Sequence, residues 1–325
     1  MDKMIFGRHM HSVIKSIYKY KLKKKEPYGR YSDINSDIEK LAIKNAIDDF
    51  NKINMRSYSD LPYTFTSTIC REQHFRMPLY KYWCNLFNEK PKLHRKQWEF
   101  VYICQSLYER GYLKKGISGV GFGVGKEPLT SLFSSFGVEV LASDLEYNSA
   151  EKLGWVNTDQ HSNYIFDLNE RGLCDEDNFK RLVSFRNIDM NKIPKDIHGY
   201  DFCWSSCSLE HLGSIAKGIE FIINSLDTLK PGGFAIHTTE FNLSSNENTI
   251  DNNDSYVIFR RKDIDVLTEL LDKNGHKIEP IDFCSGNDVI ERYVDLPPYL
   301  EEPHLRLDLN KYTATSIGLL IHKKI

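Results

Sequence analysis

The stretch that decides the fold is "ISGVGFGVGKEPLTSLFSSFGVEVLASDLE", residues 117–146. It reads as a β-rich run, a glycine-rich turn, a helical run and a second β-rich run that ends at Asp144. Glycine lets the main chain adopt φ above zero and approach a ligand or another backbone closely. The pattern therefore predicts a strand–turn–helix–strand unit whose turn lies against something. The four glycines stand at alternate positions: Gly119, Gly121, Gly123 and Gly125.

Two common phosphate-binding turns do not match this stretch. The dinucleotide fingerprint G-x-G-x-x-G requires its third glycine where this chain has Val124 or Lys126. The triphosphate-binding loop G-x-x-x-x-G-K-[ST] requires glycine at Val120 and a hydroxyl residue at Glu127. What remains is G-x-G-x-G, followed by Asp144 at about the spacing where an acid meets ribose hydroxyls in nucleoside-binding units.

The rest of the chain predicts an α/β protein with a helical N-terminal part. Residues 116–240 alternate short β-rich and helical runs, which is typical of a parallel sheet with crossover helices. A helix is expected over 262–274 and a final strand over 313–322. We therefore expect a helical extension or cap over 1–110 and a ligand-binding α/β domain over 111–325.

The composition excludes several classes of protein. The 325 residues are 41% hydrophobic and 27% charged, and the net charge of −2 gives no basic field of the kind that marks dedicated nucleic-acid binders. Seven scattered cysteines without a C-x-x-C pair suggest neither a disulfide framework nor a zinc cluster. No run approaches the roughly 18 apolar residues of a membrane helix, and no secretory signal is seen. We expect a cytoplasmic protein.

Taken in chain order, the motifs resemble the class I S-adenosylmethionine-dependent methyltransferases. The resemblance covers roughly residues 95–325. It implies a Rossmann-like sheet of about seven strands, the last one antiparallel, with helices on both faces and S-adenosylmethionine as the cofactor. Besides the glycine turn and the acid after it, the resemblance rests on "RNIDMNKIP" (186–194), "YDFCWSSCSLEHLGS" (200–214) and "LKPGGFAIHTTEFN" (229–242).

The resemblance also implies a set of cofactor-binding residues. Asp144 would bind the ribose, and the pair at 189–190 the adenine. Family members often carry an acid two residues before the first core glycine, which organises the methionine amino end, but this chain has Gly119 there. Arg95 and Lys96 are candidates for the methionine carboxylate, or else surface charges on a helix. The predicted set is Gly121, Phe122, Gly123, Gly125, Asp144, Leu145, Asp189, Met190, Ser206 and Arg95.

The candidate catalytic residues follow the predicted fourth and fifth strands. Methyl transfer requires alignment of the acceptor with the methyl group, and a base if the acceptor is a hydroxyl. His211 is the first candidate for this base, Glu240 the second, and His237 a third. The alternative for His211 is a histidine that caps a turn and packs against the next helix.

A metal is the less favoured hypothesis. "LEHL" and "TTEFN" are similar to segments of methyltransferases that bind Mg²⁺ beside the acceptor, in which the motif is Glu-x-x-Glu-His. Here Glu210 and His211 keep the last two positions, but Cys207 stands in the first. A hard cation prefers oxygen ligands, so Cys207 speaks against Mg²⁺ and is expected to be a small packing residue.

The acceptor and partners are predicted by resemblance alone. "HRKQWEF", "GFGVGKEPL" and "HTTEFN" are similar to bacterial methyltransferases of surface-polysaccharide pathways, which implies O-methylation of a sugar or glycan. The alternatives are RNA 2′-O-methylation and a cofactor-binding scaffold without catalysis. A basic run over 21–25 follows a helical pattern, which is typical of either peripheral contact with an anionic membrane or a solvated helix face.

Overall fold

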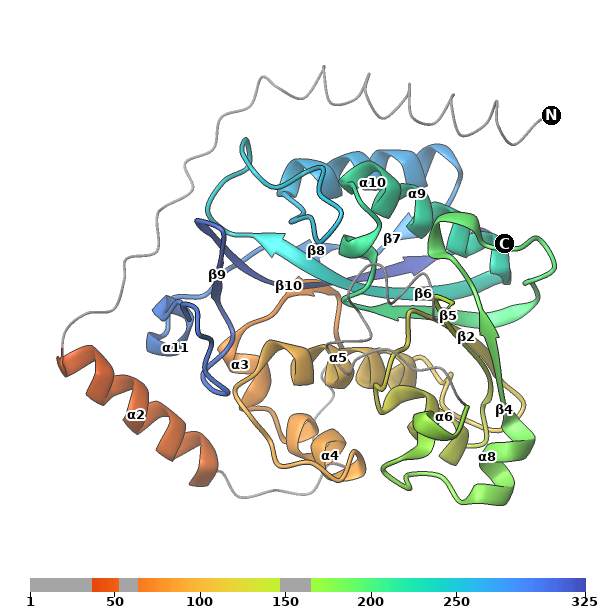
Figure 1. Ribbon diagram of the computed structural model, residues 1–325, viewed down its shortest axis with the longest axis horizontal. Helices are drawn as coiled ribbons and strands as arrows, with labels where there is room; N and C mark the ends of the chain where they lie inside the picture. The colour runs from red at the N-terminus through yellow and green to blue at the C-terminus, as the bar shows by residue number, and fades with distance from the viewer. Residues whose placement is uncertain (1–36, 53–63, 147–164) are drawn as a thin grey trace.

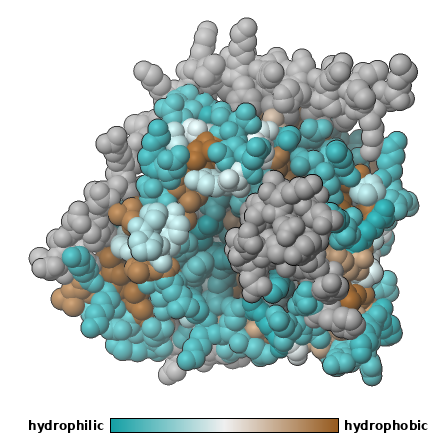
Figure 2. Space-filling model, viewed as in Figure 1, coloured by the Kyte–Doolittle hydropathy of each residue, from teal (hydrophilic) through white to brown (hydrophobic). Residues whose placement is uncertain are grey.

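The computed structural model describes residues 37–52, 64–146 and 165–325 (Figure 1). The basic N-terminal segment lies outside these ranges, so its membrane contact stays a prediction. Among the described helices, none has the length and apolarity to cross a membrane. The visible face of the molecule is mostly hydrophilic, and hydrophobic residues gather on its left side, around α11 (Figure 2).

The described strands form one sheet in the order β4-β3-β2-β5-β6-β10-β1-β8, with β7 and β9 also paired to β10. Strands β2 to β6 are parallel, whereas β10 is antiparallel to β6. The predicted α/β sheet, with its antiparallel last strand, is therefore confirmed. The strands are β1 (Ser67–Ile69), β2 (Ser118–Phe122), β3 (Glu139–Asp144), β4 (Val183–Asn187), β5 (Tyr200–Ser206), β6 (Leu229–Asn242), β7 (Lys277–Ile278), β8 (Ile281–Asp282), β9 (Leu307–Leu309) and β10 (Tyr312–His322).

Helices cover both faces of the sheet and bury a separate hydrophobic core on each (Figure 1). Helices α9 and α10 lie on one face, and α4, α5, α6 and α8 lie on the other. The α-helices are α2 (Asp37–Lys52), α3 (Glu72–Phe75), α4 (Pro78–Leu86), α5 (Arg95–Glu109), α6 (Leu129–Ser135), α8 (Glu176–Leu182), α9 (Ile215–Ser225), α10 (Arg261–Lys273) and α11 (Val289–Arg292). The 3₁₀ helices are η3 (Ile165–Asn169), η4 (Met190–Lys192), η5 (Leu209–His211) and η6 (Leu226–Thr228).

The N-terminal part is less purely helical than its sequence pattern predicts. Strand β1 enters the central sheet between β10 and β8. All three of its residues are buried, and they include β-branched Thr68 and Ile69, which suit a buried strand. Helix α5 then packs against β10 and β6. The segment ahead of residue 111 thus contributes both a strand and a covering helix to the sheet domain.

Helix α5 begins at a side-chain cap that sets its first turn. His94 has extended backbone, and its Nδ1 accepts the N–H of Lys96 at 3.1 Å. A side chain that satisfies an N-terminal N–H of a helix favours a fixed start of the helix. The cap therefore fixes Arg95 and Lys96 at the end of α5 that lies near the carboxyl ends of the strands.

Two of the four glycines lie within β2 rather than in the turn. A Cβ atom at Gly119 would lie 2.6 Å from Cε2 of Phe202, and one at Gly121 would lie 2.7 Å from Cε2 of Trp204. Both aromatic residues belong to the neighbouring strand β5, and both are fully buried. A close-packed core has no room for an added methyl group there, so glycine at these two positions leaves the space that the two rings occupy.

We expect Gly119→Ala to lower the free energy of unfolding by about 1–3 kcal/mol, because overpacking forces the Phe202 ring to move. Equilibrium denaturation in urea measures this change. The double variant with Phe202→Leu should recover part of the loss, since leucine leaves the new methyl group more space. If the two changes are simply additive, contact with the ring is not the cause.

Candidate functional site

The sheet topology has a switch point between β2 and β5. The chain continues from β2 to β3 and β4 on one side, and from β5 to β6 on the other. In open α/β sheets, ligands bind beyond the carboxyl ends of the strands at such a reversal. Here the glycine turn follows β2, and the segment that carries Ser208 and η5 follows β5.

The two segments touch at Gly123. Ser208 Oγ donates a hydrogen bond to the carbonyl of Phe122 at 3.4 Å. A Cβ atom on Gly123 would lie only 2.8 Å from the Cβ of Ser208. Gly123 and Gly125 also have φ of +61° and +49°, a region that side chains disfavour. Glycine is therefore required in the turn by both conformation and close approach.

Asp144 is tied directly to this turn. It ends β3, is 9% exposed, and its Oδ2 accepts the N–H of Gly125 at 3.1 Å. Its Oδ1 accepts the N–H of Leu145 at 2.7 Å. The pairing brings together residues that stand nineteen positions apart (144 − 125) in the sequence. It holds a carboxylate at the edge where the predicted ribose site lies.

The other predicted cofactor residues divide into two groups. Met190 lies against the turn, because a Cβ on Gly123 would be 3.2 Å from its Sδ. Asp189 instead caps η4, since its side chain accepts the N–H of Asn191 at 2.9 Å. The Phe122 ring points into the core on the α9 side of the sheet, where it meets the Phe221 ring edge to face at a centroid distance of 5.5 Å. Only the backbone of Phe122 therefore borders the turn.

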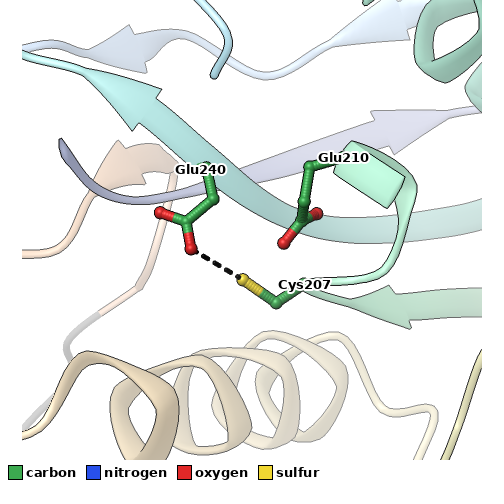
Figure 3. Close-up of side chains that lie close together, drawn as sticks. All are labelled: Cys207, Glu210 and Glu240. Carbon is green, nitrogen blue, oxygen red and sulfur yellow. Dashed lines mark hydrogen bonds between the residues drawn. The ribbon is translucent and has the colours of Figure 1, made fainter. Parts of the chain in front are cut away.

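Beyond the ends of β5 and β6, three side chains converge in a buried acidic cluster (Figure 3). It consists of Cys207, Glu210 and Glu240, and one potential ligand atom from each lies within 4.8 Å of the others. The thiol of Cys207 donates to Glu240 Oε1 at 3.8 Å. Cys207 has φ of +47°, so this residue holds a strained backbone conformation at the end of β5.

Two cations from α5 face the acidic cluster. Arg95 Nη2 forms an ion pair with Glu240, and its Nη1 lies 3.6 Å from Cys207 Sγ and 3.0 Å from Ser316 Oγ. Lys96 Nζ donates to the carbonyl of Ser206 at 3.4 Å. Arg95 was a candidate for the methionine carboxylate, but its guanidinium is directed at Glu240. The structure thus places the guanidinium against the acidic cluster rather than at the glycine turn.

A third carboxylate, Glu99, joins the two cations to the strands. It is fully buried and accepts hydrogen bonds from Thr238 Oγ1 at 2.8 Å and Ser206 Oγ at 3.2 Å. Burial favours the neutral acid, but Lys96, Arg95 and the hydroxyl groups outweigh it and lower the pKa of Glu99. Ser206, a predicted cofactor residue, therefore has its side chain engaged with Glu99. The i, i+3 and i, i+4 spacing on α5 is the sequence signal for these pairs.

The acidic cluster holds carboxyl groups of different proton affinity. Burial raises the pKa of Glu240 to about 7, and the Arg95 guanidinium limits the rise. Burial also raises the pKa of Glu210. The pKa of the Cys207 thiol rises well above its usual range for the same reason, so the sulfur keeps its proton. At neutral pH, Glu240 is thus the carboxyl group poised to exchange a proton.

The donor set does not suit Mg²⁺. A metal would need a thiolate or a third oxygen at Cys207, where burial keeps the thiol protonated. The charges of Arg95 and Lys96 already face the carboxylates that would hold the ion. The cations of the chain therefore compensate this acidic cluster, and we derive no step through a metal.

His211 lies at the rim of the acidic cluster. Its Nδ1 donates to the carbonyl of Ser255 at 2.5 Å, and its Nε2 lies 3.7 Å from Glu210 Oε1. Burial lowers the pKa of His211 to about 4. The ring is therefore neutral at pH 7 and accepts a proton less readily than Glu240 does.

His237 points away from the acidic cluster. It alternates with Thr238 along β6, so its ring lies on the α9 face, where it is fully buried. Ser205 Oγ donates to its Nδ1 at 2.8 Å, and its Nε2 donates to Ser225 Oγ at 3.2 Å. These contacts link β5 to α9 and engage both ring nitrogens, so His237 is not available as a base at the acidic cluster. Because side chains alternate along a strand, the sequence alone could have shown that His237 and Glu240 lie on opposite faces of β6.

One buried acid near the turn has no counterpart among the predicted site residues. Glu127 follows the glycine turn, is 8% exposed, and its Oε1 accepts the indole N–H of Trp204 at 2.6 Å. The only sequence signal for it was its position two residues after the last glycine.

Comparisons with solved structures find methyltransferases at low identity. Phosphoethanolamine N-methyltransferase 2 of Haemonchus contortus, in complex with S-adenosyl-L-methionine, is 15% identical (TM-score 0.44; 76% of this chain and 56% of that chain). The methyltransferase domain of bacterial CtHen1-CN is 12% identical (TM-score 0.43; 70% and 100%). The 1,6-didemethyltoxoflavin-N1-methyltransferase of Burkholderia thailandensis is 15% identical (TM-score 0.39; 67% and 75%). No protein-family model and no curated protein matches the chain. Because these values are low, the case for a function rests on the site itself.

The environment of His237 generates a prediction about stability and pH. Burial lowers its pKa to about 3, so the folded protein keeps the ring neutral while the unfolded chain protonates it below about pH 6.5. The unfolded state therefore binds more protons, and the protein loses stability as the pH falls. From pH 7 to pH 5 this one group should remove about 2 kcal/mol from the free energy of unfolding.

The test is urea denaturation at both pH values for the wild type and His237→Gln, whose amide can replace both hydrogen bonds. We expect the difference between the two pH values to shrink by about 2 kcal/mol in the variant. His276→Gln is the matched control: burial also lowers the pKa of this ring, but the ring is only half-buried, so it should contribute much less. An unchanged difference in His237→Gln would show that His237 is not held neutral.

Proposed function

We propose that the chain is an S-adenosylmethionine-dependent methyltransferase whose cofactor binds between the ends of β2 and β5. The observation that carries the proposal is the hydrogen bond from the Gly125 N–H to Asp144 Oδ2, 3.1 Å long. It places a carboxylate beside a turn whose backbone is open to close approach at Gly123. A carboxylate oxygen can accept more than one hydrogen bond, so Asp144 can bind ribose hydroxyls while it holds the turn.

The residues around the turn fit the other parts of this cofactor. Met190 is buried against Gly123 and offers a polarisable thioether to an adenine ring. The acidic cluster lies beyond the end of β5, next to the same turn, where the acceptor would meet the methyl group. Because the seven cysteines are scattered without a disulfide pattern, we further infer that the chain acts in the cytoplasm.

We assign the role of base to Glu240 ahead of His211. When bound, the cofactor would supply the methyl group: the acceptor oxygen would form a bond to the methyl carbon, and the electron pair of the broken carbon–sulfur bond would remain on sulfur. Glu240 would receive the proton that the acceptor hydroxyl loses. Its pKa of about 7 suits general-base catalysis at neutral pH better than the value of about 4 at His211.

The second oxygen of Glu240 supports this assignment. Oε1 takes Arg95 and Cys207, whereas Oε2 is buried and has no hydrogen-bond partner among the described residues. A buried polar atom without a partner costs free energy, and a hydroxyl from the acceptor would satisfy it. Arg95, held by Glu240 and Ser316, positions the carboxylate.

A sugar or glycan is the acceptor that we propose, on the strength of the sequence resemblance alone. A buried carboxyl base is compatible with any hydroxyl acceptor, a ribose 2′-OH included. The rival RNA substrate is disfavoured by the net charge of −2, because affinity for nucleic acid depends largely on phosphate contacts. RNA binding that weakens steeply with salt would favour the rival.

The first prediction from this proposal concerns binding. S-adenosylmethionine and S-adenosylhomocysteine should both bind with saturation in isothermal titration calorimetry, whereas ATP and NAD should not. Asp144→Ala should weaken both ligands at least tenfold, because it removes the acceptor for the ribose and the hydrogen bond to the turn.

Asp227→Ala is the matched control for this titration. Asp227 is exposed in η6, at the opposite end of the sheet, and its loss should leave binding unchanged. No binding by the wild type at millimolar ligand would mean that the turn serves something else. Binding with loss of methyl transfer to every acceptor would instead favour the silent scaffold.

The second prediction concerns the pH dependence of catalysis. A hydroxyl acceptor can be sought by transfer of a labelled methyl group to nucleotide sugars and short RNAs. At saturating cofactor, kcat/KM for that acceptor should fall as the pH drops below about 7. Glu240 is then protonated and cannot accept a proton. Glu240→Gln should lower kcat/KM by about 10²–10⁴-fold and abolish this pH dependence.

His211→Gln separates the two candidates for the base. If Glu240 is the base, this variant keeps the decline below pH 7. If His211 is the base, the decline in the wild type lies near pH 4 and disappears in the His211 variant. The second result would reverse our assignment.

A further inference from the structure

The site lacks a carboxyl group where the resemblance implies one. The family acid that organises the methionine amino end would stand at Gly119. A side chain there is excluded, because a Cβ would already lie 2.6 Å from the Phe202 ring. If the proposed cofactor binds here, its ammonium group needs a partner from another position.

Glu127 lies on the same face of β2 as that missing side chain. A side chain at Gly119 would meet the ring of Phe202, and one at Gly121 would meet the ring of Trp204, both on β5. The Glu127 carboxyl group lies at the edge of the same Trp204 ring, whose indole N–H it accepts at 2.6 Å. The Glu127 N–H also donates to the carbonyl of Val124 at 3.2 Å, which folds the chain back over the end of the turn. The carboxyl group therefore lies beside the glycine turn.

The Glu127 carboxyl group is buried without a cation. It is 8% exposed and forms no ion pair with any described residue. Lys96, the cation whose charge acts on this group, is directed instead at Ser206 and at Glu99, 3.9 Å from Glu99 Oε2. Burial raises the pKa of Glu127 to about 8, only partly opposed by the Trp204 hydrogen bond and by Lys96. In the free protein at pH 7, this group is therefore mostly protonated.

The other buried carboxyl groups near the turn already have charged or multiple partners in the chain. Glu99 is surrounded by two cations and three hydroxyl groups. Glu240 is paired with Arg95. Asp144 is hydrogen-bonded to the backbone of the turn. Glu127 has one neutral donor and is the buried acid beside the turn that a ligand cation would complete.

We propose that Glu127 binds the α-ammonium group of S-adenosylmethionine, in place of the acid that Gly119 cannot supply. The inference rests on the proposed function and adds a specificity residue to it. A charged hydrogen bond in a dry site is stronger than a neutral one, so this contact should distinguish the amino-acid end of the cofactor from a plain nucleoside.

The contact also has a consequence for protons. A bound ammonium group favours the carboxylate form of Glu127, so the group must lose the proton that it carries in the free protein. Because its pKa starts at about 8, binding at pH 7 should release close to one proton for each complex formed. For the same reason, affinity should rise between pH 6 and pH 8.

The experiment compares two ligands and two proteins by calorimetry at pH 7. S-adenosylhomocysteine carries the amino-acid end, and 5′-methylthioadenosine has the same nucleoside and a thioether without it. Glu127→Gln should bind S-adenosylhomocysteine about 10–100-fold more weakly and 5′-methylthioadenosine as the wild type does. Titrations in two buffers of different ionisation enthalpy should show proton release by the wild type that Glu127→Gln lacks.

The variant is designed to exclude a merely structural role. Glutamine has nearly the same shape, and its amide oxygen can still accept the Trp204 N–H, so packing is preserved. Unchanged binding of S-adenosylhomocysteine by Glu127→Gln would overturn the inference, as would equal weakening of both ligands. The proton release by the wild type is an independent test, because it requires no folded variant, and its absence would also overturn the inference.

The proposed function fails in a different way. If the wild type binds neither ligand, the methyltransferase proposal falls and this inference falls with it. If the wild type binds both ligands, Asp144→Ala loses both and Glu127→Gln loses neither, the function stands and only the role of Glu127 is refuted.

Discussion

The centre of this fold depends on the contact between two aromatic rings of β5 and the glycines of β2. Phe202 and Trp204 occupy the space that side chains at Gly119 and Gly121 would fill. These rings belong to the residues of β5 that pair in register with the two glycines, at the switch point of the sheet. The same Trp204 ring then holds Glu127 beside the turn, so the packing of the core and the chemistry of the proposed cofactor site are connected.

A second constraint is the burial of charge at the ends of β5 and β6. Burying isolated carboxylates is unfavourable, and the chain compensates them with Arg95 and Lys96 from the first turn of α5. The compensation is uneven. Glu99 is held as a carboxylate, whereas Glu240 has a pKa of about 7. One buried acid is thus structural, while the other can take up a proton near neutral pH.

Much of the fold could be predicted from the sequence, because local patterns carried it. The β-rich runs at 117–122 and 139–143 became β2 and β3, and the helical run at 262–274 became α10, each within about a residue. The site was predicted less completely. The hydrogen bond between Asp144 and the turn was not predicted, Arg95 is paired with the acidic cluster, and His237 lies on the opposite face. Position after a strand shows that a residue is near an edge, yet not which partners its side chain selects.

The sequence by itself determined the alternation of strands and helices over residues 116–240, the glycine turn and the acid at the end of β3, because periodicity and turn residues act over a few positions. Only the tertiary structure decided which charges meet. Arg95 and Glu240 stand 145 residues apart, and Glu127 and Trp204 stand 77 apart. Such pairs form when strands and helices stack, and their pKa values follow from burial, which no local pattern encodes. The chemistry available at this site is therefore a property of the packed protein.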